Sequence, residues 1–419
     1  MSDKAGCPHP SRLCLGGSFP NNWQLPCYDL PHLIQLNPYQ RILYTKTVVV
    51  LGFAAGFSLS PKLWVSTRFY PLIPVFHGLP RIPYPLDYLL FGLLFLLLAL
   101  AGMSLKPRAA MIGFTALLLI LACCDQTRWQ PWAYLYLFML LSLACFSWNA
   151  DDFAGTANSL NICRLIVVAT YFYSGLQKMN TRFAAGVFSL LGREASHHFL
   201  FTMLGYALAA IETLIAIGLV TRKYRKIAVI AGVCMHLFIL FSCIFIYRWN
   251  SVVWPWNIAM IVLLVLLFWR SDTTPIAILW RNPIRLQKVV LVLFGILPSL
   301  SFFGLWDSYL SASLYSANVP VGNILIGEAV KAELPAAIQR RVTTIPDGDV
   351  LRIQDWSLAE LNVPPYPAMR AYRTVAADVC RYSHNSPDVM LIVHEKDTLL
   401  GKGALVRDTC FGTLMVNRW

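Results

Sequence analysis

Long apolar runs separated by short polar loops fill the first three quarters of this 419-residue chain. A helix needs about 20 apolar residues to cross the hydrocarbon core of a bilayer. We predict about nine transmembrane helices, several of them short enough to be tilted or partly buried. Their approximate ranges are 42–60, 87–104, 109–124, 133–149, 159–177, 202–220, 227–247, 253–269 and 288–306.

The end of the chain shows a different pattern. Short apolar runs at 350–353 and 389–393 predict strands, and residues 368–381 predict a helix that follows a proline-rich turn. The expected fold class is therefore an all-α polytopic membrane protein with a small C-terminal α+β domain. We divide the chain into a tail (1–40), a transmembrane domain (41–310) and a soluble extracytoplasmic domain (311–419).

Composition agrees with a lipid-facing surface. The chain is 57% hydrophobic and only 13% charged, whereas a soluble domain has about 25% charged residues. Residues 311–419 hold 11 basic and 11 acidic residues, so the whole net charge of +13 lies in residues 1–310. Basic residues that flank spans indicate anionic headgroups of the lipid bilayer as the partner, and a nucleic acid is not expected because no basic stripe occurs on the soluble domain.

The basic loops also predict an orientation. Lysine and arginine residues collect in three loops that fall on one side of a nine-span arrangement, which makes that side cytoplasmic. These residues are Lys106 and Arg108; Arg222, Lys223, Arg225 and Lys226; and Arg270, Arg281, Arg285 and Lys288. The first 40 residues contain no apolar signal-peptide region. We expect a multi-pass protein of a bacterial cytoplasmic membrane, with the N-terminus inside and the C-terminal domain outside.

Lys178 closes the predicted span at 159–177 and lies on the outer face in this topology. A lysine at the end of a span commonly extends to the lipid headgroups, which would make Lys178 an anchor. Alternatively its amine is partly desolvated, and a desolvated amine can act as a neutral base near neutral pH. Lys178 is therefore the candidate catalytic residue, and its spacing alone leaves both roles open.

Glu212 and His236 occur near the middle of two successive predicted spans. Ionisable side chains at this depth are costly and normally face a partner or a cavity. Because the two spans are antiparallel neighbours, a contact between Glu212 and His236 is geometrically allowed. Such a contact is either a structural tie between helices or a proton relay at a quinone-type headgroup site.

Other polar residues lie near the ends of the spans. Arg164 is expected to be an interfacial anchor at the cytoplasmic start of its span. Asp125 and Arg128 occur in the outer loop after residue 124 and are candidate rim residues on the side of Lys178. Asn250 and Asn257 flank an outer tryptophan cluster, and an aromatic belt does not explain them. Asp125, Asn250 and Asn257 therefore join Glu212 and His236 as supporting polar candidates.

Cysteine and histidine patterns add little chemistry. Cys380 and Cys410 form the only cysteine pair in the C-terminal region, and a disulfide between them is one of two open alternatives if that region is outside the cytoplasm. The adjacent pair His197–His198 lacks the spacing of a metal site. We expect no metal, and the sequence has no P-loop or hydrolase motif.

The segment Arg164–Asn180 resembles the vitamin K-dependent γ-carboxylase family and, more broadly, the HTTM domain. In that family an arginine opens the span, a Tyr-Phe pair follows, and the span ends in a small-Gly-aliphatic-x-Lys-aliphatic-Asp/Asn pattern. Arg164, Tyr171–Phe172 and the run Ser174-Gly175-Leu176-Gln177-Lys178-Met179-Asn180 match without a gap. The resemblance implies that Lys178 deprotonates a reduced quinone similar to vitamin K, on the outer face.

A second segment, residues 125–136, resembles the part of the carboxylase that holds an active-site histidine, but Trp132 occupies the position of that histidine. His236 and Asn250 resemble later positions of the family more loosely. The resemblance covers roughly residues 40–310. The C-terminal region is shorter than the large luminal part of the carboxylase that binds its protein substrate.

Two functions remain open at this stage. The first is an HTTM enzyme that activates a reduced quinone through Lys178, with Glu212 and His236 as polar partners. The second is a non-enzymatic membrane maturation or immunity factor for a secreted peptide or protein. Trp132 favours the second function slightly. A transporter would need inverted repeats, which the sequence does not show.

Overall fold

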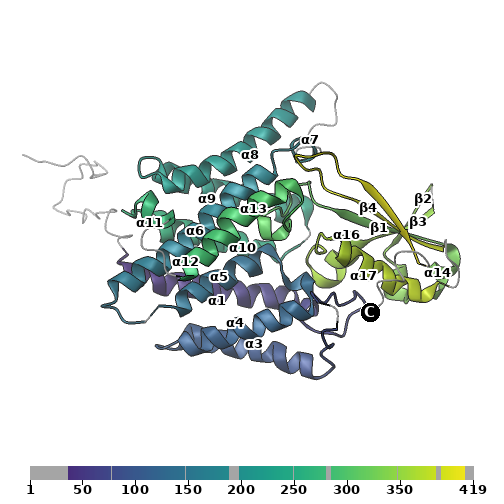
Figure 1. Ribbon diagram of the computed structural model, residues 1–419, viewed down its shortest axis with the longest axis horizontal. Coiled ribbons are helices and arrows are strands. Elements are labelled where there is room, and N and C mark those ends of the chain that lie inside the picture. Colours follow the sequence, from purple (N-terminus) through teal and green to yellow (C-terminus); the bar gives the residue numbers. More distant parts are fainter. Residues whose placement is uncertain are drawn as a thin grey trace, which may run out of the picture. The chain divides into compact units, whose positions relative to one another are not determined.

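The computed structural model describes residues 36–76, 78–146, 148–187, 198–248, 250–279, 285–346, 348–383 and 388–410, and these residues are mostly helical (Figure 1). Six helical segments are long and apolar enough to cross a membrane. They are α1 (Pro38–Leu59), α3 (Leu86–Met103), α6 (Phe153–Gln177), α8 (His198–Val220), α9 (Arg225–Phe241) continued by the π-helix η4 (Ser242–Tyr247), and the segment formed by α12 (Arg285–Val290), η5 (Leu291–Ile296), α13 (Leu297–Leu300) and η6 (Ser301–Phe303).

Three of the predicted spans form shorter helices. They are α4 (Arg108–Cys124), α5 (Pro131–Ala144) and α10 (Val253–Phe268), with 17, 14 and 16 residues. At 1.5 Å per residue, α5 is about 21 Å long, whereas the hydrocarbon core of a bilayer is about 30 Å thick. By length and composition, the prediction of nine spans is therefore confirmed for six.

Helix α6 is the central helix of this domain. Within its apolar window 83% of the residues are buried, compared with 22% in α3 and in the α9–η4 segment. It packs against α1, α5, α8 and α10. Its polar residues can therefore bond to protein rather than face lipid: Ser159 Oγ donates to Ser142 O (3.1 Å), and Ser142 Oγ donates back to Ser159 O (3.2 Å).

Arg164 differs from its predicted role as an interfacial anchor. Its side chain is buried, Nε donates to Leu267 O (2.7 Å), and Nη1 donates to Asn161 Oδ1 (2.7 Å). Leu267 belongs to the last turn of α10, where backbone carbonyls have no partner within the helix and the helix dipole favours a cation. Arg164 is therefore a cap for α10, and the prediction of an anchor is wrong.

The C-terminal region forms a five-stranded antiparallel sheet in the order β2-β3-β1-β4-β5. Ile324 of β1 pairs with Leu351 of β3 on one side and with Leu391 of β4 on the other. These three side chains are buried, and α16 and α17 pack on the sheet. The strands are β1 (Val321–Ile326), β2 (Val342–Ile345), β3 (Gly348–Arg352), β4 (Val389–His394) and β5 (Leu405–Thr409), and the main helices are α16 (Ile353–Leu361) and α17 (Met369–Val379).

The two predicted strands and the predicted helix of this region are confirmed as β3, β4 and α17. Strands β1, β2 and β5 were not predicted. The remaining short elements are α2 (Pro61–Trp64), η2 (Gln126–Arg128), α7 (Thr181–Gly186), α11 (Pro275–Leu279), η7 (Tyr309–Ser311), α14 (Glu328–Glu333), α15 (Ala336–Gln339) and η8 (Cys380–Tyr382).

Helix α16 attaches the sheet domain to the helical domain. The backbone N–H groups of Phe69 and Tyr70 donate to the two carboxylate oxygens of Glu360 at 2.7 and 2.9 Å. Asn362 ends α16 in a left-handed conformation (φ 57°), and its amide donates to Leu59 O (2.8 Å) and Ser251 Oγ (2.7 Å). The C-terminal domain is thus bonded to the end of α1 and to the loop before α10.

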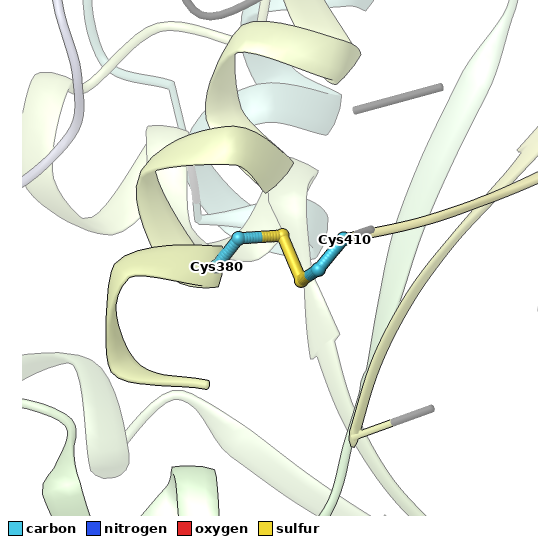
Figure 2. The surroundings of a disulfide bond; sticks show 2 residues. All are labelled: Cys380 and Cys410. Carbon is cyan, nitrogen blue, oxygen red and sulfur yellow. A yellow bond between two sulfur atoms is a disulfide. The ribbon is translucent and has the colours of Figure 1, made fainter. Parts of the chain in front are cut away.

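A disulfide joins Cys380, directly after α17, to Cys410, directly after β5 (Figure 2). Both residues are buried. The bond therefore ties the helix that covers the sheet to the last strand of the sheet, and it resolves the alternative that the sequence left open.

Removing this disulfide is expected to destabilise the C-terminal domain by about 3–4 kcal/mol, because a closed loop of about 30 residues restricts the unfolded chain. The variant C380S/C410S should be cleaved at a lower temperature than the wild type in thermal proteolysis of the whole protein. The control is Cys145→Ser, which changes an exposed free cysteine. If C380S/C410S and Cys145→Ser are cleaved at the same temperature, the prediction is contradicted.

Candidate functional site

Lys178 lies directly after the last residue of α6 and forms an ion pair inside the protein. Its Nζ donates to Glu212 Oε2 of α8 at 2.7 Å and to Ser174 Oγ at 2.5 Å. The two charged side chains are 14% and 11% exposed, so Lys178 is not extended freely toward headgroups. Ser174 precedes Lys178 by four residues and therefore shares its face of the helix.

Gly175 explains why Lys178 reaches Glu212. A Cβ atom at Gly175 would lie 2.5 Å from Thr213 N and 2.8 Å from Ala209 O, both in the backbone of α8. Only glycine allows the two helices to approach this closely. The short distance between α6 and α8 in turn lets the lysine at the end of one helix meet the glutamate inside the other.

A second polar chain lies on the same face of α6. Tyr171 Oη and His236 Nε2 are 2.5 Å apart, and His236 Nδ1 is 2.7 Å from Asn257 Oδ1. Asn257 Nδ2 donates to Val253 O at 2.8 Å, which orients the amide with its oxygen toward His236. His236 therefore carries its proton on Nδ1, and Tyr171 donates its hydroxyl proton to Nε2.

The Lys178–Glu212 ion pair and the chain Tyr171–His236–Asn257 are close enough to interact electrostatically. Glu212 and Lys178 both lie within electrostatic range of His236, and Glu212 lies within range of Tyr171. Tyr171, Ser174 and Lys178 follow the spacing i, i+3, i+7, which places them along one stripe of α6. The sequence allowed a contact between Glu212 and His236, but in the structure Glu212 bonds to Lys178 while His236 bonds to Tyr171.

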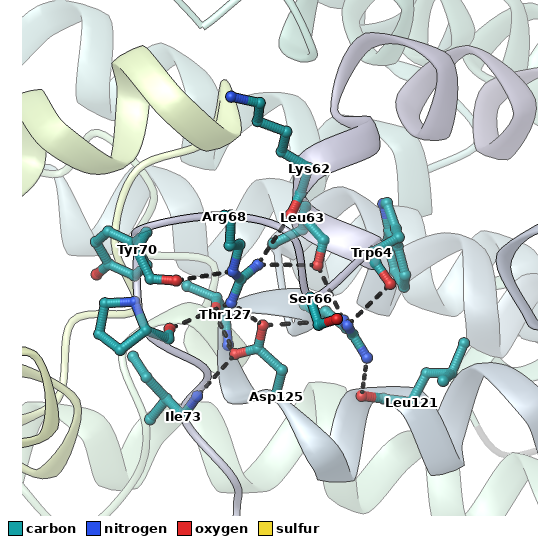
Figure 3. A network of polar contacts seen from close by, with 12 residues as sticks. Lys62, Leu63, Trp64, Ser66, Arg68, Tyr70, Ile73, Leu121, Asp125 and Thr127 are labelled. Atoms are coloured by element: carbon teal, nitrogen blue, oxygen red, sulfur yellow. Dashed lines mark hydrogen bonds and ion pairs between the residues drawn. The ribbon is translucent and has the colours of Figure 1, made fainter. Parts of the chain in front are cut away.

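Asp125 belongs to a different cluster, shown in Figure 3. Its buried carboxylate accepts from Arg68 Nη2 (2.5 Å), from the backbone of Ile73 (3.3 Å) and Thr127 (3.1 Å), and from the Thr127 hydroxyl. Arg128 donates to three backbone carbonyls, those of Leu63, Leu121 and Trp64, at 2.7–3.0 Å. Asp125 and Arg128 were expected on an exposed rim, but both are buried and fasten the loop after α1 to the end of α4.

Asn250 also lies apart from the ion pair. It has a left-handed conformation (φ 49°), and its amide nitrogen donates to Tyr315 Oη in the segment that leads to β1. Next to that tyrosine, Ser316 O accepts from Asn180 Nδ2 at 2.8 Å. Asn180 ends the segment that resembles the carboxylase family but was not predicted as a site residue. Its side chain also caps α7 by accepting from Phe183 N (2.9 Å).

Two buried polar atoms near these residues have no hydrogen-bond partner within the described part of the chain. They are Gln177 Nε2 and Asn250 Oδ1. Burying a polar atom without a partner costs free energy. Gln177 Nε2, in the residue directly before Lys178, can donate to a hydroxyl or carbonyl oxygen, whereas Asn250 Oδ1 can only accept from a donor such as a hydroxyl.

Trp132 is part of the hydrophobic core. It is 2% exposed, and its ring lies edge-on to Phe53, Phe57 and Tyr136 at centroid distances of 6.2–6.3 Å. Gly56 makes room for the indole, because a Cβ atom there would lie 2.7 Å from the ring. An indole in this packing offers no base.

Two cavities of about 20 Å³ each lie elsewhere in the helical domain, and each has room for about one water molecule. Neither is lined by Lys178 or Glu212. The ion pair instead lies at the margin of the lipid-facing surface, since its neighbours Ile211, Leu214 and Met179 are 45%, 61% and 47% exposed. A substrate that reached Lys178 would therefore arrive from the surface rather than from these cavities.

The sequence predicts that the adjacent pair His197–His198 does not form a metal site. His197 and the side chain of His198 lie outside the described residues. Among the residues that the structure does describe, no group of three His, Cys, Asp or Glu side chains is arranged to bind a metal ion.

No protein-family model, curated protein or solved structure matches the chain.

Proposed function

We propose that all nine apolar helices cross the bilayer. Contacts at both ends support the short helix α10 as a crossing: Ser251 before it bonds to Asn362 of the C-terminal domain, and Trp269 O after it accepts from Arg41 at the start of α1 (2.8 Å). Nine crossings place the two ends of the chain on opposite sides. The basic loops then put the N-terminus in the cytoplasm and the C-terminal domain outside a bacterial cytoplasmic membrane.

We further propose that the protein is an HTTM-type enzyme, related to the membrane domain of vitamin K-dependent γ-carboxylase, that activates a reduced quinone. The observation that supports this best is the largely buried Lys178–Glu212 pair at the margin of the lipid-facing surface. A lipid-soluble hydroquinone would approach this pair laterally from the bilayer. The amide nitrogen of Gln177, the residue before Lys178, is buried without a hydrogen-bond partner among the described residues.

The ion pair can supply a base without a net change of charge. Moving the shared proton from Lys178 to Glu212 gives an amine and a carboxylic acid, and a low dielectric favours this neutral form more than water does. A hydroquinone hydroxyl then gives its proton to Lys178 Nζ, and the ammonium stabilises the phenolate that forms. Tyr171 and His236 form a hydrogen-bonded pair beside the ion pair that could exchange a proton, and Asn257 orients the imidazole.

The proposed overall reaction consumes one O₂ for each hydroquinone. The hydroquinone loses two electrons and two protons, and epoxidation of a ring double bond supplies two more electrons. One oxygen atom of O₂ becomes the epoxide oxygen, and the other leaves as water with the two protons. In the resemblance to the carboxylase family, Trp132 takes the place of a histidine, and its ring is buried in the aromatic core. The proposed reaction then either stops at epoxidation or acts on an acceptor other than glutamate.

Oxygen uptake tests this function. Purified protein in nanodiscs should consume O₂ when a reduced menaquinone or vitamin K hydroquinone is added, and Lys178→Ala should reduce the rate to that of empty nanodiscs. Lys223→Ala, in the loop between α8 and α9, is the matched control and should keep the wild-type rate. Equal rates for the wild type and Lys178→Ala would refute the proposal.

A second function, maturation of or immunity to a secreted peptide without catalysis, is favoured by the core position of Trp132 alone. In that case Lys178→Ala would complement a gene deletion as well as the wild type does. Substitutions on exposed surfaces of the C-terminal domain would then abolish complementation while leaving the amount of protein in the membrane unchanged.

A further inference from the structure

The turn between β4 and β5 exposes two leucines to solvent. Leu399 and Leu400 are 72% and 78% exposed, and they form the two-residue tip closed by a β-bridge between Thr398 and Gly401. Burying a leucine side chain is normally favourable by a wide margin. Two adjacent exposed leucines at the tip of a closed hairpin therefore indicate a surface that something apolar covers.

The tip is bonded to the end of the last membrane-length segment, Arg285–Phe303. Leu399 N donates to Phe302 O at 2.8 Å, and Lys396 Nζ donates to Ser301 Oγ at 2.8 Å. Gly304 ends the segment with φ 76°, and a Cβ atom there would lie 3.5 Å from the Thr398 methyl group. The hairpin is therefore held at the end of this segment.

The exposed leucines continue the apolar surface of that segment. Phe303 and Leu305, at its end, are 42% and 72% exposed. Lys402, two residues beyond the tip, is exposed and can approach anionic headgroups. The bridge between Thr398 and Gly401 pairs backbone groups at the tip, which lowers the cost of placing it in an apolar medium.

We infer that the Leu399–Leu400 tip of the C-terminal domain is inserted into the interfacial region of the bilayer beside the last membrane segment. The occupant of this apolar surface is lipid, because the surface is continuous with residues that already face lipid. The inserted tip would hold the sheet domain at a constant height over the outer ends of the helices. This inference requires that the segment Arg285–Phe303 crosses the membrane, and it is independent of the proposed reaction.

An environment-sensitive fluorescent amino acid at position 400 tests the insertion in full-length protein, with one copy per nanodisc. Lipids that carry a nitroxide near the headgroup should quench it several-fold more than the same probe at Thr343, an exposed position in the edge strand β2. The probe at Leu305 is the positive control. Quenching at position 400 no stronger than at position 343 would overturn the inference.

A second measurement separates insertion from self-association. With the probe at Lys402, the variant L399S/L400S should lose the lipid quenching, whereas Leu405→Ser, which changes another exposed leucine of the same hairpin, should keep it. If shielding of the probe at position 400 needs two copies in a nanodisc and occurs without lipid quenching, the tip binds a second copy of the chain and the inference is wrong.

Discussion

Replacing Glu212 by Gln is expected to lower quinol-dependent oxygen uptake by about 10²–10⁴-fold, the usual contribution of general acid–base catalysis. Glutamine keeps the size of the side chain and an oxygen that can accept from Lys178. It removes the carboxylate that exchanges a proton with the amine. Without the carboxylate, no neighbouring group could take the ammonium proton in a step that keeps the pair neutral, and the amine would have to exchange protons with water across an apolar surface.

Two comparisons make this prediction specific to the pair. Ser174→Ala removes the other acceptor of Lys178 Nζ but leaves the carboxylate, so its rate should stay close to that of the wild type. The double variant K178Q/E212Q should be as inactive as Glu212→Gln but more stable to heat, because it leaves no charge unpaired. Activity of Glu212→Gln within a few-fold of the wild type would remove Glu212 from the proposed mechanism.

Asp125→Ala is expected to destabilise the helical domain by about 3–5 kcal/mol, the range observed when one partner of a buried ion pair is removed. Asp125 is wholly buried and lies 2.5 Å from Arg68 and 3.9 Å from Arg128. Burial already lowers the pKa of Arg128 to about 10, and the charge of Asp125 opposes that change. Without the carboxylate, the two buried guanidinium groups would repel each other and the loop after α1 would lose its attachment.

The measurement is the thermal unfolding of the whole protein in nanodiscs, followed by proteolysis and by fluorescence. Asp355→Ala is the control, since Asp355 forms an exposed pair with Arg352 at 3.8 Å that should contribute less than about 1 kcal/mol. Arg68→Ala should destabilise the protein as Asp125→Ala does, because it breaks the same pair. A melting temperature for Asp125→Ala equal to that of Asp355→Ala would show that the cluster in Figure 3 is not a structural tie.

Part of the site could be predicted from the chain because membrane burial makes polar residues conspicuous. Lys178, Glu212 and His236 attracted attention as ionisable groups within apolar runs, and Asn257 as an amide that an aromatic belt does not explain. The structure bonds Lys178 to Glu212 and His236 to Asn257.

The partners within these pairs could not be predicted in the same way. The sequence allowed a contact between Glu212 and His236 because their helices are antiparallel neighbours. In the structure, the close approach of α6 and α8 at Gly175 instead brings Glu212 within hydrogen-bonding distance of Lys178. Tyr171, the partner of His236, was part of the resemblance but was not singled out as a polar contact. Its spacing of seven residues from Lys178 was the signal that could have identified it.

Asp125 and Arg164 show the limit of arguing from position along the chain. Both occur near the ends of apolar runs, where charged residues normally face water or headgroups. Both are buried instead, because the loop after α1 folds over Asp125 and the end of α10 lies beside Arg164. Their roles depend on carbonyl and guanidinium groups more than 50 residues away in the sequence.

By itself, the sequence predicted the broad class of this chain: a mostly helical part with membrane-length apolar helices, followed by a small region that contains strands. Hydrophobic length and period are local properties, so they can be counted along the chain. Tertiary structure alone decided which buried charges meet, that Cys380 bonds to Cys410, and that the β4–β5 hairpin lies at the end of the last membrane-length segment. These are contacts between residues distant in sequence, and their distances depend on how closely helices and strands pack.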